Sequence, residues 1–130
     1  MLRFLVLSIV FAVFVSCGAE AADRAIPDTA TLQTWIRANR ALVLVDVRIA
    51  EQYRKGHIPT ALHIPLTTIE DRPGSVPRGN PLVLYCNKGK MSGRAQAALR
   101  KAGFTNVINF GGVSRWQGKL AAGSAPGTLE

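Results

Sequence analysis

The chain has 130 residues, enough for one domain with a single modest hydrophobic core. Hydrophobic residues make up 48% of it and charged residues 18%, which favours a globular protein and excludes an intrinsically disordered one. The formal net charge of +8 favours anionic partners. The basic residues form no single run, however, so a solvated basic surface is the simpler interpretation.

Residues 1–21 are predicted to be a signal peptide. Arg3 supplies a positive charge, residues 4–15 are apolar, and Ala19, Glu20 and Ala21 form an A-x-A cleavage pattern. Since a membrane-spanning helix needs about 20 apolar residues, we expect cleavage after Ala21 and export to the periplasm. Two alternatives stay open: a retained anchor, or lipidation of Cys17, whose surroundings resemble a bacterial lipobox. We expect membrane contact only in the lipidated form.

Cleavage would leave Cys86 as the single cysteine. An exported protein with one cysteine cannot form an internal disulfide. A lone thiol in an oxidising compartment is a liability unless it is buried or used. Cys86 is therefore the first candidate for chemistry.

Apolar and β-branched runs in the first half of the chain alternate with helical patterns. Asp28 is predicted to cap a helix over residues 31–38, and a short helical turn follows at residues 51–55. Strands are predicted at residues 41–45, 61–64, 81–85 and 107–110. Residues 71–81 hold three prolines and two glycines and are expected to form a loop.

The second half of the chain continues this alternation. Ser92 is predicted to cap a helix that runs to residue 102, where Gly103 ends it and Phe104 packs back. A short helix is expected at residues 113–117. We place the domain at residues 28–118 and expect residues 119–130 to form a loose tail. Alternating strands and helices predict an α/β fold whose parallel sheet is covered on both faces.

The predicted turn after strand 81–85 places Cys86 where functional groups gather in such folds. Backbone N–H groups of a tight turn point inward beside the positive end of the next helix, which lowers a thiol pKa and favours the thiolate. Lys88, Lys90 and Arg94 add positive charge, and Gly89 supplies conformational freedom. The alternative is a buried structural cysteine, which the neighbouring lysines and glycine disfavour.

Three blocks of the sequence resemble the rhodanese family. The segment Cys86-Asn87-Lys88-Gly89-Lys90-Met91-Ser92 resembles the C-x-x-G-x-x-[ST] active-site loop of that family. Residues 45–48, 51–53 and 56–59 resemble its first signature, and residues 107–112 with Trp116 resemble its second. The blocks follow the family's order, and the chain resembles in particular the small, exported, single-domain group.

The resemblance implies a three-layer α/β/α domain with a central, mainly parallel sheet of about five strands. It also implies a thiosulfate sulfurtransferase that needs no cofactor or metal and carries sulfur on Cys86 as a persulfide. The acceptor would be cyanide, a small thiol or a thioredoxin-like protein. We expect a monomer that does not bind nucleic acid. The implied substrate-binding residues are Asn87, Lys88, Gly89, Lys90, Met91 and Ser92, and the implied supporting residues are Asp46, Arg48 and Arg94.

Three positions depart from the family pattern and bear on the choice of donor and acceptor. Asn87 stands where a basic residue is common, Met91 where arginine is common, and Thr60 where glycine is usual.

Two other functions stay open. A persulfide carrier for a partner protein would use the same chemistry at Cys86. A cysteine phosphatase or arsenate reductase would need an arginine at the position of Ser92 to bind the oxyanion with two hydrogen bonds, and is the weaker alternative.

Overall fold

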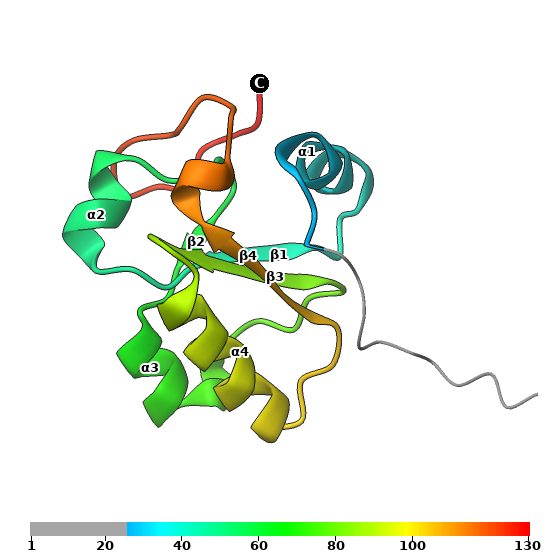
Figure 1. Cartoon of the computed structure of the whole chain (residues 1–130), viewed down its shortest axis with the longest axis vertical. Helices are drawn as coiled ribbons and strands as arrows, with labels where there is room; N and C mark the ends of the chain where they lie inside the picture. The colour runs from blue at the N-terminus through cyan, green and yellow to red at the C-terminus, as the bar shows by residue number, and fades with distance from the viewer. Residues whose placement is uncertain (1–25) are drawn as a thin grey trace, which may run out of the picture.

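The computed structural model describes residues 26–130, so the predicted signal peptide and Cys17 lie outside the described residues. A four-stranded parallel sheet with the order β2-β1-β3-β4 forms the central layer (Figure 1). Its strands are β1 (Val43–Asp46), β2 (Leu62–His63), β3 (Leu82–Cys86) and β4 (Val107–Gly112).

Helices cover both faces of this sheet. On one face lie α1 (Thr29–Ala38) and α2 (Ala50–Lys55), and on the other lie α3 (Leu66–Asp71) and α4 (Lys90–Lys101) (Figure 1). Two single-turn 3-10 helices, η1 (Pro73–Ser75) and η2 (Val113–Arg115), complete the set. The predicted α/β class and the three-layer arrangement are confirmed. All four strands expected from apolar runs are present. The expectation of about five strands came from the family resemblance, and the sheet within residues 26–130 has four strands.

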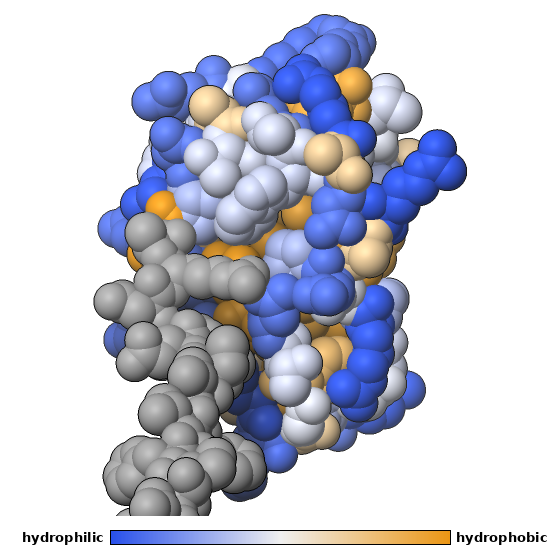
Figure 2. Space-filling view, turned by 90° about the vertical axis from the view of Figure 1, so that its right-hand side faces the viewer, coloured by the Kyte–Doolittle hydropathy of each residue, from blue (hydrophilic) through white to orange (hydrophobic). Residues whose placement is uncertain are grey.

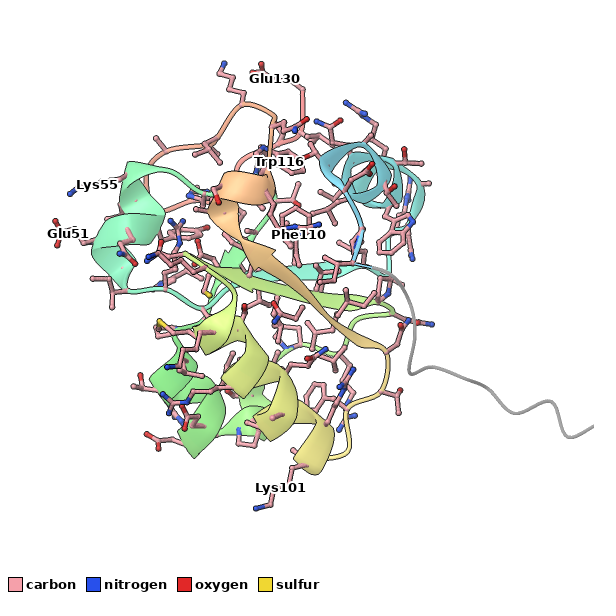
Figure 3. All side chains as sticks on the ribbon, in the orientation of Figure 1. Glu51, Lys55, Lys101, Phe110, Trp116 and Glu130 are labelled. Atoms are coloured by element: carbon pink, nitrogen blue, oxygen red, sulfur yellow. The ribbon has the colours of Figure 1, made fainter. Side chains whose placement is uncertain are left out.

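Burial on both faces explains why the sequence of the central strand β3 does not alternate between apolar and polar residues. All five of its residues are buried. Leu82, Leu84 and Cys86 belong to the core cluster under α3 and α4, whereas Val83 and Tyr85 belong to the cluster under α1 and α2. Successive strand residues point to opposite faces, so a strand covered on both sides is apolar throughout. Phe110 of β4 and Trp116 join the second cluster and point toward α1 (Figure 3).

The helices differ from the predictions chiefly at α3 and at the start of α4. α3 was not predicted; its buried residues Leu66 and Ile69 are three apart, but six residues are too few to show a period. α4 begins at Lys90, with Gly89 rather than Ser92 at the N-cap. Ser92 therefore lies inside the first turn. The cap at Asp28 is confirmed, since its Oδ1 accepts the Thr31 N–H at 2.8 Å.

The C-terminal tail is held against the domain, whereas the sequence analysis expected residues 119–130 to be loose. His57 and Ala121 exchange backbone hydrogen bonds of 2.9 and 2.8 Å, and Thr60 N–H donates to the Pro126 carbonyl at 2.9 Å. Leu129 packs against the core cluster under α1 and α2. The hydrogen bonds use backbone groups of the tail, so its small, polar side chains carry no signal for them.

Few large hydrophobic side chains are exposed among residues 26–130: they are those of Ile26, Ile49 and Leu120. Figure 2 shows polar and charged side chains over most of one face, with small hydrophobic areas between them. Among residues 26–130, no helix combines the length and the apolar content that crossing a bilayer requires.

A buried ion pair at the end of β1 holds the loop that follows. Arg48 Nη2 lies 2.6 Å from Asp46 Oδ2, and Arg48 Nε lies 3.0 Å from both carboxylate oxygens. The same Nη2 donates to the Gly56 carbonyl at 2.6 Å. Asp46 is fully buried and Arg48 is 5% exposed. The two predicted supporting residues thus connect β1 to the segment that leads into β2.

The buried position of this pair gives a test of its structural role. Replacing Asp46 by Ala leaves the Arg48 guanidinium buried without its counter-charge, so we expect the free energy of unfolding to fall by about 3–5 kcal/mol. Urea unfolding measures the loss. The control is Glu51→Ala, which removes an ion pair to Lys55 (3.1 Å) whose side chains are 71% and 77% exposed (Figure 3). Exposed pairs contribute little, so equal losses in the two variants would contradict the role.

Candidate active site

Cys86 is the last residue of β3, and only three residues separate it from α4. Gly89 has a φ of +96°, a left-handed conformation that L side chains rarely adopt, and this reverses the chain within the turn. Its N–H points back at Cys86 and donates to Sγ at 3.0 Å. The short step from strand to helix therefore surrounds the sulfur with backbone donors, as the sequence predicts.

The thiol of Cys86 is buried, with 2% of the residue exposed. Burial raises its pKa, but hydrogen bonds from the Ser92 side chain and from the N–H groups of Ser92, Gly89 and Lys88 lower it. The net effect is a pKa below the ordinary value of a cysteine. Ser92 Oγ lies 3.3 Å from Sγ. A core cysteine of a purely structural kind would lack these donors, so the site favours a thiolate nucleophile.

The end of β4 forms the floor of the active-site loop, residues 86–91. A Cβ on Gly112 would overlap the carbonyl oxygen of Asn87, so only glycine allows this approach. A Cβ on Gly89 would lie 3.2 Å from Gly111 Cα. The predicted strand ended at residue 110, whereas β4 extends to Gly112, and its two terminal glycines let the loop pack on the sheet.

Asn109 contacts the same loop and was not predicted as a site residue. Its Oδ1 accepts the Ser92 hydroxyl at 2.7 Å and the Gly111 N–H at 2.9 Å, and its Nδ2 donates to the Gly89 carbonyl at 3.1 Å. The available signal was a single polar residue between Ile108 and Phe110, inside a predicted strand.

The remaining predicted residues do not all face the sulfur. Asn87 Nδ2 donates to Gln52 Oε1 of α2 at 3.1 Å, and Lys88 and Lys90 are exposed around the loop. Met91 is partly buried against the core under α3 and α4.

Arg94 is engaged elsewhere. Its Nη2 lies 2.6 and 3.0 Å from the two carboxylate oxygens of Glu70 on α3. The ion pair directs the guanidinium to α3, which argues against a direct contact of Arg94 with an anion at Cys86.

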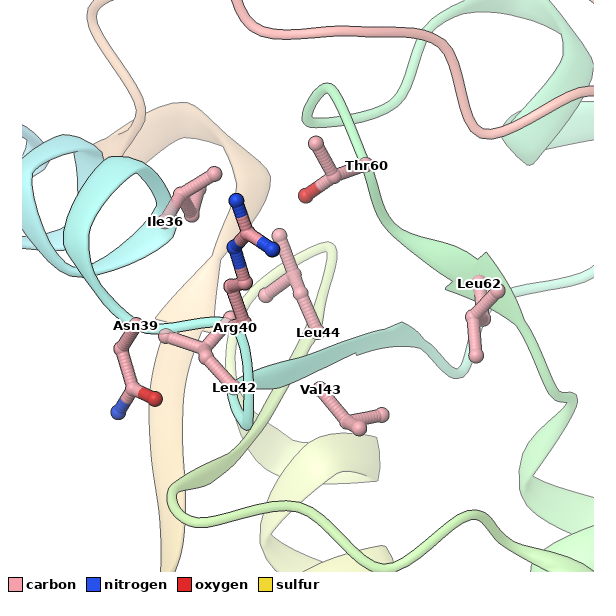
Figure 4. A pocket seen from close by; sticks show the side chains of 8 residues that line it. All are labelled: Ile36, Asn39, Arg40, Leu42, Val43, Leu44, Thr60 and Leu62. Carbon is pink, nitrogen blue, oxygen red and sulfur yellow. The ribbon is translucent and has the colours of Figure 1, made fainter.

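Other parts of the domain offer less chemistry. A hollow beside the start of β1 is lined by Ile36, Asn39, Arg40, Leu42, Val43, Leu44, Thr60 and Leu62 (Figure 4). It lies toward the opposite end of the parallel sheet from Cys86, and no cysteine lines it. Within residues 26–130, no group of three or more His, Cys, Asp or Glu side chains is placed to hold a metal ion.

Comparison with known proteins agrees with this geometry. The thiosulfate sulfurtransferase PspE of Escherichia coli is 42% identical over 71 residues, which cover 53% of this chain and 68% of PspE. A candidate sulfur carrier protein, YrkF of Bacillus subtilis, is 35% identical over 85 residues, 65% of this chain and 46% of YrkF. The solved structure described as a rhodanese with anions from E. coli superposes with a TM-score of 0.56 at 32% identity, over 63% of this chain and 99% of that one.

The match to the family extends over nearly the whole described chain. Residues 28–119 match the rhodanese-like domain, close to the range 28–118 over which the sequence resemblance extends. The matched range contains all four strands and the loop around Cys86. The chain therefore belongs to the rhodanese family of sulfurtransferases.

Proposed function

We propose that the protein is a thiosulfate sulfurtransferase that moves sulfane sulfur from thiosulfate to cyanide or a thiol through a persulfide on Cys86. The observation that carries this proposal is the setting of Sγ, which accepts the Gly89 N–H at 3.0 Å and lies 3.3 Å from Ser92 Oγ. In the persulfide the negative charge lies on the terminal sulfur, one S–S bond beyond Sγ, and the other backbone N–H groups of the loop would stabilise it there.

The first half-reaction is a displacement at sulfur. The Cys86 thiolate attacks the outer sulfur of thiosulfate, and a new S–S bond forms at Sγ. The S–S bond of thiosulfate breaks, and its electron pair leaves with sulfite. No proton has to be removed from the nucleophile when it is already a thiolate, so the lowered pKa of Cys86 favours this step.

The second half-reaction restores the enzyme. Cyanide or a thiolate attacks the terminal sulfur of the persulfide, the S–S bond to Sγ breaks, and Cys86 keeps the electron pair as a thiolate. Thiocyanate or a new persulfide is released. Covalent catalysis of this kind divides the transfer into two displacements at one sulfur atom.

The active-site loop would bind the substrate through two kinds of group. Backbone N–H groups of residues 87–92 would hold the sulfur and oxygens. The exposed ammonium groups of Lys88 and Lys90 would attract the dianion to the loop. Asp46 and Arg48 would act as supports, because both are buried in their own ion pair.

A carrier that delivers persulfide sulfur to one partner protein is the second candidate. The similarity to YrkF favours it, and the chemistry at Cys86 would be the same. Fast turnover with a protein thiol together with slow turnover with small thiols and cyanide would favour the carrier.

We also propose that the protein is exported to the periplasm, on the basis of Arg3, the apolar residues 4–15 and the A-x-A pattern that ends at Ala21. N-terminal sequencing of protein recovered from the periplasmic fraction should begin at Ala22. A blocked, lipid-bearing Cys17 would replace this proposal with membrane anchoring.

Intact mass spectrometry tests the persulfide. Incubation with thiosulfate should add about 32 Da to the protein, the mass of one sulfur atom, because the displacement leaves sulfane sulfur on Cys86. Cyanide should remove it. The Cys86→Ser variant is the control and should keep its fold, gain no mass and release no thiocyanate. A mass gain in that variant, or none in the wild type, would contradict the proposal.

Steady-state kinetics tests the role of Lys88. Removing one exposed charge beside the loop should raise the KM for thiosulfate roughly three- to tenfold in Lys88→Ala, with little change in kcat. The difference should shrink at high salt. Lys101→Ala is the matched control, because Lys101 ends α4 far from the loop (Figure 3). Equal KM changes in the two variants would mean that backbone N–H groups alone bind the anion.

A further inference from the structure

The hydroxyl of Ser92 has one hydrogen and three acceptors within reach. Ser92 Oγ lies 2.7 Å from Asn109 Oδ1, 3.1 Å from the Gly89 carbonyl oxygen and 3.3 Å from Cys86 Sγ. A serine hydroxyl donates one hydrogen bond at a time. The shortest of the three distances places that hydrogen on Asn109 when the sulfur does not compete strongly for it.

The side chain of Asn109 keeps other hydrogen bonds when it loses the one from Ser92. Its Oδ1 also accepts the Gly111 N–H at 2.9 Å, and its Nδ2 donates to the Gly89 carbonyl at 3.1 Å. When the Ser92 hydroxyl turns away, the carboxamide keeps one hydrogen bond at each end. The cost of an unpaired polar atom is therefore avoided.

We propose that Asn109 is a positioning residue that holds the Ser92 hydroxyl while Cys86 is a neutral thiol and releases it when the sulfur becomes negatively charged. In the neutral state the thiol hydrogen points to Ser92 Oγ, and the hydroxyl hydrogen points to Asn109. When the thiol proton leaves to solvent, the hydroxyl turns and donates to Sγ. The inference rests on the proposed function, in which the sulfur must be a reactive thiolate.

Competition between Asn109 Oδ1 and Cys86 Sγ for the hydroxyl hydrogen of Ser92 would keep the sulfur nucleophilic. A thiolate loses intrinsic nucleophilicity as its pKa falls, so a donor that stabilised it without restraint would slow the attack on thiosulfate. The hydrogen bond to Asn109 must be broken before Ser92 can stabilise the anion, which weakens the stabilisation that Ser92 gives.

Several charged groups lie on the elements around Cys86, and all of them are left unchanged by the variants below. They are Lys88 in the loop, Lys90 and Arg94 on α4, the pair Asp46 and Arg48 after β1, and Arg115 after β4. Their influence on the thiol is thus a constant background.

The test follows the rate of alkylation of Cys86 by iodoacetamide against pH, because only the thiolate reacts. In the wild type the midpoint should lie below the ordinary cysteine value of about 8.5. Asn109→Leu keeps the approximate size but removes the acceptor, so the midpoint should fall further, by roughly 0.5 to 1 pH unit. Ser92→Ala should raise the midpoint, since a donor to Sγ is lost.

The double variant is the decisive control. If Asn109 acts through the hydroxyl, Asn109→Leu should have no effect on the midpoint in the Ser92→Ala background. A rise in the midpoint of Asn109→Leu, or the same fall with and without Ser92, would overturn the inference and point to a purely structural role. Asn109→Ala repeats the test if the leucine variant does not fold, and thermal unfolding identifies that case.

The experiment separates this inference from the proposed function. Alkylation uses no thiosulfate, so the pattern of midpoints holds or fails regardless of persulfide formation. Absence of the mass gain together with the expected midpoints would remove sulfur transfer but keep the role of Asn109. A mass gain with unexpected midpoints would do the reverse.

Discussion

The close approach of the β3–α4 turn to the end of β4 is the constraint on which the active site depends. A register shift between Leu84 and Tyr85 brings Gly111 opposite Tyr85 and Gly112 opposite Cys86. Any side chain on Gly112 would overlap the Asn87 carbonyl and push the loop outward. The Gly89 N–H would then move away from Sγ. The chemistry of the sulfur therefore follows from strand pairing, and not from one reactive residue alone.

Uncharged hydrogen-bond donors and charged side chains have different roles around this loop. The groups that hydrogen-bond to Sγ are uncharged: backbone N–H groups of the loop, such as that of Gly89, and the Ser92 hydroxyl. The lysines are exposed and lie at the rim, where solvent screens them. Short-range donors thus decide the charge state of the sulfur, whereas the lysines bear on how readily an anion arrives. The buried pair of Asp46 and Arg48 contributes rigidity, because its charges are already neutralised by each other.

The sequence predicted those features that one stretch of chain determines locally. Apolar runs predicted all four strands, and the predicted position of Cys86 between a strand and a helix is confirmed. Features that depend on distant partners were missed. Asn109 gains its importance from Ser92 and Gly89, which lie 17 and 20 residues away. Thr60 departs from the usual glycine yet has a φ of +75°, a left-handed conformation that its sequence alone would disfavour. Its N–H is held by Pro126, far along the chain.

The attachment of the tail bears on where this domain ends. The family match stops at residue 119, but His57 Nε2 lies 2.9 Å from the Ala125 carbonyl and 3.1 Å from that of Pro126. His57 is fully buried. A domain cut at the family boundary would open this imidazole to water and uncover the core beneath Leu129. The packed domain thus extends beyond the range of the family match, at least to Leu129.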